Sequence, residues 1–172
     1  MTKKKRFILR TILAVGEGET EQAFLKFLKQ IYVLRGRGVS VKTPLGKQGG
    51  ELSGSVSKAE RIKENGDYEC VFLLRDLDTR EFSSGENIRG ILLLGSTPCI
   101  EGLFLDVLVP HKRKESWTAA QCKREFESGY LDEKKKLDSR NYFSVFSKEK
   151  IEVARRGIPV LNDILNILEG NF

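Results

Sequence analysis

The chain has 172 residues, with 30 Lys or Arg against 24 Asp or Glu and a formal net charge of +6. At roughly 150 residues per domain this length predicts one compact domain, and 40% hydrophobic with 31% charged residues exclude a largely disordered chain. No apolar run reaches the roughly 18–20 residues that cross a bilayer, and no signal-peptide pattern follows the basic start. Three widely spaced cysteines predict no disulfide framework, so we expect a cytoplasmic protein without a membrane partner.

The first 110 residues alternate hydrophobic runs with helical patterns. Apolar runs predict strands over residues 7–15, 39–43, 70–74 and 91–94, and helical spacing of apolar residues predicts helices over 20–34, 55–64 and 100–109. Alternating strands and helices favour parallel βαβ units. We therefore predict an α/β fold with a mainly parallel sheet of about four strands flanked by helices.

The last third of the chain is helical and basic. Helical patterns cover residues 118–127 and 148–156, and an apolar stripe closes the chain from Ile158 to Leu168. Residues 11–110 carry 12 basic and 14 acidic side chains, whereas residues 111–150 carry 11 and 7. We predict a core over residues 1–110 and a helical extension over 111–172 packed on the same domain. The closing stripe suits both core packing and a homodimer.

Acidic side chains follow two of the predicted strands. Glu17 follows the first strand, Glu21 lies one turn further on the next helix, and Asp76 and Asp78 follow a later strand. The carboxyl ends of parallel strands share one edge of a sheet, so these acids are expected to converge there, with Glu101 as a fifth candidate. Carboxylate ligands favour Mg²⁺ or Mn²⁺ over zinc. The alternative is that they stabilise helix N-termini and turns.

Three motifs resemble those of RloB-like proteins. They are Glu-Gly-Glu-Thr-Glu at 17–21, Asp-Leu-Asp at 76–78 and Ser-Thr-Pro-Cys-Ile-Glu at 96–101. RloB-like proteins belong with the TOPRIM domains, which also occur in topoisomerases, bacterial primases and overcoming-lysogenization-defect nucleases. The resemblance covers about residues 8–110 and implies a Rossmann-like TOPRIM catalytic core over residues 1–110. Thr97 stands where the family usually has Asn, and Gly102 where it more often has a larger residue.

The resemblance also implies roles for the five acids. Glu17 corresponds to the first glutamate of the TOPRIM pattern, and Asp76 with Asp78 to the pair that binds Mg²⁺. Glu21 and Glu101 match the remaining acids of the motifs. Such a set suits a two-metal reaction, in which one ion activates a water and the other stabilises the leaving oxygen of a phosphodiester. The sequence has no GxSxG motif of serine hydrolases and no GxxxxGK[ST] motif of P-loop nucleotide-binding proteins, so neither of these chemistries is expected.

Basic side chains are expected to balance the charge of a phosphate. Lys47 in a glycine-rich segment is the candidate that we group with the catalytic residues Glu17, Asp76 and Asp78. Lys112, Arg113 and Lys114 are the predicted nucleic-acid contacts, although basic runs are also typical of solvated faces.

The sequence thus predicts a metal-dependent endonuclease acting on DNA or RNA with Mg²⁺ or Mn²⁺. The resemblance to RloB-like proteins further implies a role in prokaryotic anti-phage defence with an ABC-type ATPase partner. The alternative is a non-catalytic TOPRIM subunit that binds nucleic acid or regulates another protein.

Overall fold

A five-stranded sheet forms the centre of the fold. The structure, a computed structural model, describes residues 10–35, 38–44, 52–77, 83–111, 113, 116–131 and 142–172. The strands are β1 (Arg10–Gly16), β2 (Val39–Lys42), β3 (Cys70–Asp76), β4 (Asn87–Ile88) and β5 (Ile91–Ser96), in the order β2-β1-β3-β5-β4. Strands β2, β1, β3 and β5 are parallel, and β4 pairs antiparallel with β5. The predicted α/β class and mainly parallel sheet are confirmed.

Helices follow the strands along the chain. They are α1 (Glu19–Tyr32), α2 (Leu52–Glu64), α3 (Ile100–Leu108), α4 (Ala119–Tyr130), α5 (Tyr142–Val145), α6 (Lys148–Arg155) and α7 (Pro159–Leu168). The sheet has one strand more than the sequence predicts, because β4 is only two residues long and carries no hydrophobic alternation.

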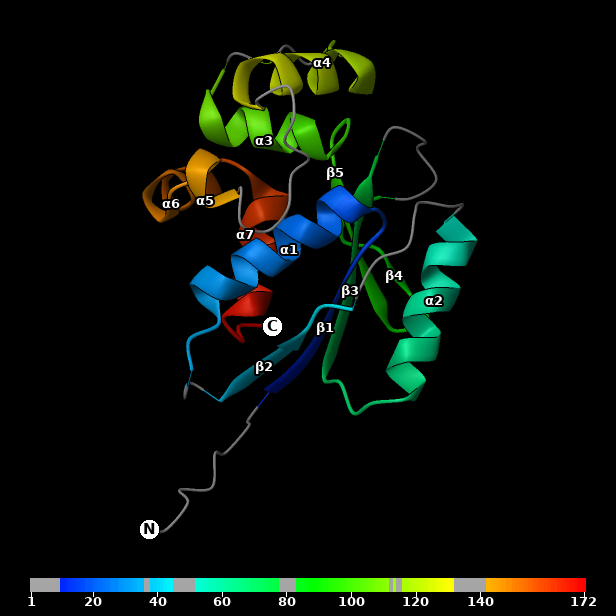
Figure 1. The fold of residues 1–172 in the computed structure, drawn as a ribbon. Helices are drawn as coiled ribbons and strands as arrows, with labels where there is room; N and C mark the ends of the chain where they lie inside the picture. Colours follow the sequence, from blue (N-terminus) through cyan, green and yellow to red (C-terminus); the bar gives the residue numbers. More distant parts are fainter. Residues whose placement is uncertain are drawn as a thin grey trace.

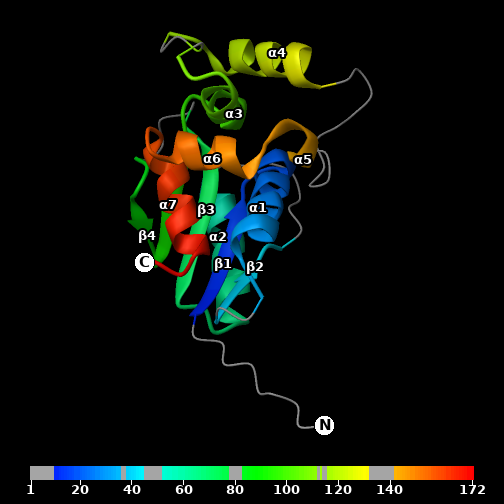
Figure 2. The ribbon, with the colours of Figure 1, turned by 90° about the vertical axis from the view of Figure 1, so that its left-hand side faces the viewer.

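The sheet is covered on both faces, as its continuous hydrophobic strands require. On one face, alternate residues such as Leu13 and Leu73 pack against Val56 and Ala59 of α2. On the other face, the intervening residues, such as Phe72, pack against α1 and α7. Figures 1 and 2 show these helices on opposite sides of the sheet. The sheet is therefore the middle layer of three.

Helices α3 and α4 lie over the edge at which β1, β3 and β5 end (Figure 1). Phe104 of α3 is completely buried, and its ring lies 4.9 Å from that of Phe24 in α1 and 5.1 Å from that of Phe126 in α4, measured between centroids. Tyr142 and Phe146 join the same cluster. Side chains from the end of the chain thus share the core formed by the sheet and α1.

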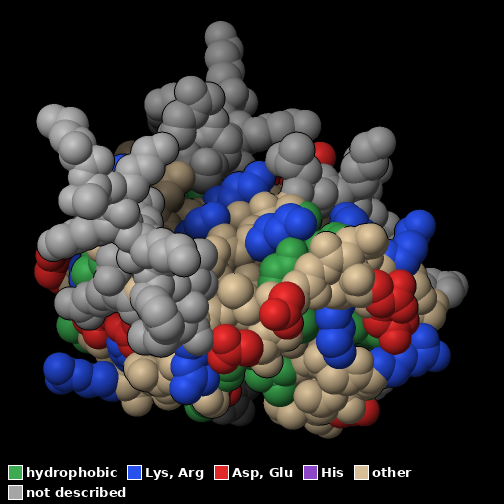
Figure 3. All heavy atoms as spheres, turned by 90° about the horizontal axis from the view of Figure 1, so that it is seen from below, with side chains coloured by type: hydrophobic (Ala, Val, Ile, Leu, Met, Phe, Trp, Pro, Cys, Tyr) green, Lys and Arg blue, Asp and Glu red, His purple; other side chains and the backbone are tan. Residues whose placement is uncertain are grey.

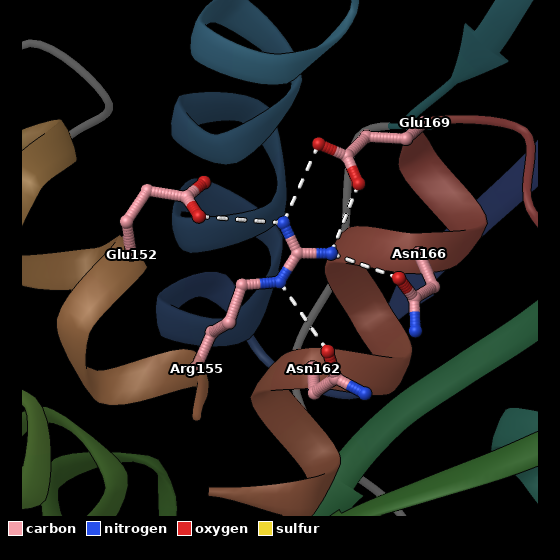
Figure 4. Close-up of polar contacts among 5 residues, drawn as sticks. All are labelled: Glu152, Arg155, Asn162, Asn166 and Glu169. Atoms are coloured by element: carbon pink, nitrogen blue, oxygen red, sulfur yellow. Dashed lines mark hydrogen bonds and ion pairs between the residues drawn. The ribbon is translucent and has the colours of Figure 1, made fainter. Parts of the chain in front are cut away.

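Arg155 fastens α6 to α7 (Figure 4). Its Nη2 donates hydrogen bonds to Asn166 Oδ1 at 2.8 Å and to Glu169 Oε2 at 2.9 Å, and its Nε donates to Asn162 Oδ1 at 3.3 Å. Glu152, one turn back on α6, lies 3.5 Å from Nη1. The N–H donors of this guanidinium therefore connect α6 to α7 and stabilise the packing of these two helices.

The opposite edge of the sheet, where the parallel strands begin, carries side chains of both signs. Seen from below, Lys and Arg are mixed with Asp and Glu and with small hydrophobic areas (Figure 3). Of the helices that the structure describes, none combines the length and the apolar character that a membrane span needs.

Candidate functional site at the carboxyl edge of the sheet

Three neighbouring parallel strands end together beneath α3. Gly16 of β1 pairs with Leu74 of β3, and Asp76 of β3 pairs with Ser96 of β5. The backbone N–H of Glu17 continues the ladder by donating to the Leu74 carbonyl at 2.9 Å. The polar residues that follow each hydrophobic run therefore reach the same edge, where ligands bind in open parallel sheets.

Asp76 fixes the start of α3. Its Oδ1 accepts hydrogen bonds from the backbone N–H of Ile100 at 2.7 Å and from Ser96 Oγ at 3.0 Å. The first N–H groups of a helix have no partner within the helix, and a carboxylate at this end also interacts favourably with the helix dipole. Asp76 thus acts as the cap that the N-cap residue Cys99 does not supply through its own side chain.

Glu21 is a buried carboxyl group in the first turn of α1. Only 6% of the residue is exposed, and its Oε2 accepts a hydrogen bond from the N–H of Gly18 at 2.9 Å. Burial raises its pKa to about 7, and the nearby charges of Asp76 and Glu101 add to the rise. A carboxyl group with this pKa exchanges a proton near neutral pH.

The helix containing Glu21 is held close to β1. Gly16 donates its N–H to Gln22 Oε1 at 2.8 Å, and a Cβ on Gly16 would lie 2.5 Å from the backbone nitrogen of Gln22. A real Cβ cannot approach so closely, so this position requires glycine. The close approach brings Glu21 towards the ends of the neighbouring strands.

Glu101 enters the same region from α3. It is the second residue of that helix and is 92% buried, since 8% of its surface is exposed. Its Oε2 is buried and accepts no hydrogen bond from any residue that the structure describes. A buried carboxylate oxygen without a donor is costly, so a donor or cation at this position would be stabilising.

Glu17 lies at the same edge but on the other face of the sheet. Side chains alternate along a strand, so Arg75 shares the α2 face with Leu73, and Glu17 shares it with Val15. Glu17 Oε2 lies 3.1 Å from Arg75 Nε, and the two side chains are only 16% and 4% exposed. Asp76 and Glu101 lie within electrostatic range of Glu21, and Glu17 is paired with a buried arginine.

Lys123 is a functional candidate that the sequence analysis missed. It follows Cys122, whose sulfur would lie 3.5 Å from a Cβ added to Gly102 of α3, so this part of α4 is directly against α3. The carboxylate of Glu101 contributes most to a raised pKa of Lys123, and Asp76 contributes further. Lys123 is exposed and lies within electrostatic range of these acids. The sequence predicts a helix over residues 118–127, but it does not show that this helix packs on α3.

The remaining predicted site residues divide into two groups. Asp78, Lys47, Lys112 and Lys114 lie outside the described residues. Arg113 is described, and its Nη2 and Nε donate to both carboxylate oxygens of Asp106, with a shortest distance of 2.7 Å. Among the residues that the structure describes, no group of three or more His, Cys, Asp and Glu side chains is arranged to hold a metal ion. The five-carboxylate metal site stays a prediction.

Comparisons of this chain with known proteins identify no relative. No family model, no curated protein and no solved structure matches the chain. The fold places it in a structural class, that of α/β proteins with a mostly parallel sheet between helices, compatible with a Rossmann-like arrangement. Its candidate site consists of the buried Glu21 and Glu101, the half-buried Asp76 and the exposed Lys123 of α4.

Proposed function

We propose that this protein is a divalent-metal-dependent nuclease with a TOPRIM core, as its resemblance to RloB-like proteins implies. The observation that carries the proposal is the convergence of Glu21, Asp76 and Glu101 at the carboxyl edge, with Glu101 Oε2 buried and without a donor among the described residues. Like charges that interact in a partly buried place are unfavourable unless a proton or a cation is shared between them.

The donor set fits Mg²⁺ or Mn²⁺. All three groups are carboxylates, and hard oxygen ligands suit these ions. Glu101 Oε2 has capacity for a cation, and Asp76 Oδ1 accepts two hydrogen bonds that hold this carboxylate in place. The resemblance adds Asp78 and Glu17 as ligands, and Glu17 would have to leave its ion pair with Arg75 to bind the same ion. When bound, such ions polarise a phosphodiester and lower the pKa of a coordinated water.

The chain's own side chains support this chemistry in distinct ways. Lys123 would attract and orient a phosphate, because its exposed side chain lies within electrostatic range of Glu101 and Asp76. Glu21 would take or release a proton at its carboxylate, since its pKa of about 7 lies at the working pH. Asp76 would keep its position through Ser96 and Ile100.

The substrate and partners belong to the same proposal. The basic residues of segments 1–10 and 111–150 suit a polyanion, so the substrate is DNA or RNA. Anti-phage defence and an ABC-type ATPase partner are what the family resemblance adds.

The test is cleavage by the full-length chain. Purified protein is incubated with plasmid DNA, single-stranded DNA and total tRNA in Mg²⁺ or Mn²⁺, with EDTA as a control. We expect cleavage of at least one substrate, lost in EDTA and in the Asp76→Asn and Glu101→Gln variants. Asn at position 76 can still accept the hydrogen bonds from Ser96 and Ile100, so the fold is preserved. Asp67→Asn, an exposed residue before β3, is the matched control and should cleave normally.

A second function is favoured by the ion pair between Glu17 and Arg75, which already neutralises one of the predicted ligands. In that case the chain would be a nucleic-acid-binding subunit. Isothermal titration calorimetry with Mn²⁺ separates the two. Mn²⁺ binding that depends on Glu101, without cleavage of any substrate, would favour the binding subunit, and the absence of both would refute the nuclease proposal.

A further inference from the structure

A cavity of about 430 Å³ opens beside the acidic edge. Leu77 and Thr97, which directly follow Asp76 and Ser96, form its inner wall. Leu103 of α3 and residues 157–160, which lead from α6 into the first turn of α7, form the outer wall. Figure 2 shows how α6 lies between α3 and α7 at this side of the molecule. The cavity therefore begins one residue away from the proposed site.

The walls combine apolar and polar side chains in equal number. Five leucine, isoleucine, proline and valine side chains, five polar side chains and two glycines line it. Small-molecule sites typically have volumes of about 300–1,000 Å³ and combine apolar walls with polar groups that orient the ligand, and the polar share of this cavity is high. The cavity thus has the size and the chemistry of a site for a small ring.

The polar groups favour a neutral ligand that donates hydrogen bonds. Arg113 is held by both oxygens of Asp106, so its charge is already balanced. Asp163 adds a second carboxylate to the lining. Among the described lining residues, two carboxylates stand against one guanidinium, a balance that favours N–H donors over a phosphate. The flat face of the guanidinium also offers a stacking surface.

We infer that this cavity binds a nucleobase with an exocyclic amino group, carried by the nucleotide next to the phosphodiester held at the acidic edge. The inference rests on the proposed function, since it assumes a nucleic-acid substrate. A base has apolar faces that suit the leucine and proline walls and an edge whose amino group can donate to Asp163. Adenine, cytosine and guanine carry such a group, and uracil does not.

The test uses neutral nucleosides in EDTA, so that neither metal nor phosphate contributes. Adenosine, cytidine, guanosine and uridine are titrated into the isotopically labelled full chain, and methyl chemical shifts are followed by NMR. We expect at least one amino-bearing nucleoside to bind with a Kd in the millimolar range, about tenfold more tightly than uridine. The shifts should centre on Leu103, Ile158 and Val160. No binding, or shifts centred elsewhere, would overturn the inference.

Two variants test the cavity directly. Gly157→Phe should fill it, because a Cβ at Gly157 has no atom closer than 4.0 Å, and binding should be lost. Gly129→Phe on α4, where a Cβ meets nothing within 4 Å, is the matched control. Asp163→Asn should weaken binding about fivefold, whereas Asp67→Asn should not change it. Unchanged affinity in both Gly157→Phe and Asp163→Asn would refute the inference. Should Gly157→Phe fail to fold, unchanged affinity in Asp163→Asn alone would refute it.

This experiment separates failure of the inference from failure of the proposed function. Glu101→Gln should bind nucleosides as the unmodified chain does, because Glu101 does not line the cavity. Nucleoside binding without any cleavage of nucleic acid would support the cavity and contradict the nuclease. Cleavage without nucleoside binding would support the nuclease and overturn the cavity.

Discussion

Glu21→Gln should make the metal-free protein more stable at alkaline pH. Burial of the Glu21 carboxylate, together with the charges of Asp76 and Glu101, raises its pKa from 4.5 to about 7 in the folded protein. The folded chain therefore binds this proton more tightly than the unfolded chain. Glutamine has nearly the same shape, carries no charge, and can still accept the hydrogen bond from the N–H of Gly18.

The magnitude follows from the pKa shift. Each pKa unit corresponds to about 1.4 kcal/mol, so the free energy of unfolding of the unmodified chain falls by about 3 kcal/mol as the pH rises from 4.5 to about 7. Below this interval Glu21 is protonated in both states, and above it the folded state carries the full cost of a buried charge. The variant has no such pH-dependent term, so its advantage grows through the interval.

The assay is urea unfolding in EDTA near pH 5 and near pH 8. We expect the stability of Glu21→Gln relative to the unmodified chain to increase by about 2–3 kcal/mol between the two conditions. Glu19→Gln, on the same helix but exposed, is the matched control and should show little change in either condition. If the difference in the free energy of unfolding between the variant and the unmodified chain stays constant with pH, burial does not disfavour the charged form of Glu21 and the reasoning is refuted.

Three further predictions concern other parts of the fold. Gly16→Ala should destabilise the protein by more than about 2 kcal/mol in urea unfolding, because its Cβ would lie 2.5 Å from the nitrogen of Gln22, and a smaller loss would contradict the close packing. Arg155→Met should cost about 1–3 kcal/mol in the same assay, since it removes the hydrogen bonds to α7, whereas an unchanged midpoint would show that this cluster is incidental. Lys123→Met should slow the proposed cleavage about 10–100-fold without weakening Mn²⁺ binding in calorimetry, and weaker Mn²⁺ binding would contradict a role towards phosphate.

The parallel strands could be predicted because their hydrophobic runs are continuous. Residues 70–74 are apolar on both faces, and the same run proved to be the central strand β3. The strand extends to Asp76 because the ladder with β5 continues through Arg75 and Asp76, two residues whose charges had suggested a turn. Polar residues at the end of a strand still form its backbone hydrogen bonds. The change from apolar to polar side chains is therefore a poor predictor of the last residue of a buried strand.

The candidate site was predictable only in part. Topology alone brings Asp76 to the end of its strand, and helix geometry brings Glu21 and Glu101 near it. The pairing of Glu17 with Arg75 depends on which face of the sheet each side chain takes, and that required the strand register. Lys123 depends on how α4 packs on α3, a contact between separate helices for which the sequence pattern fixes neither partner nor angle.

The double use of Asp76 has a consequence for interpreting variants of this protein. The carboxylate that is proposed to bind metal also anchors the first turn of the helix that carries Glu101. Truncation to alanine would therefore loosen a second proposed ligand at the same time, and the loss would exceed what one carboxylate contributes. An alanine scan would assign to Asp76 alone an effect that comes from Asp76 and Glu101 together. Asparagine removes only the charge, because its side-chain oxygen can still accept the hydrogen bond from Ile100.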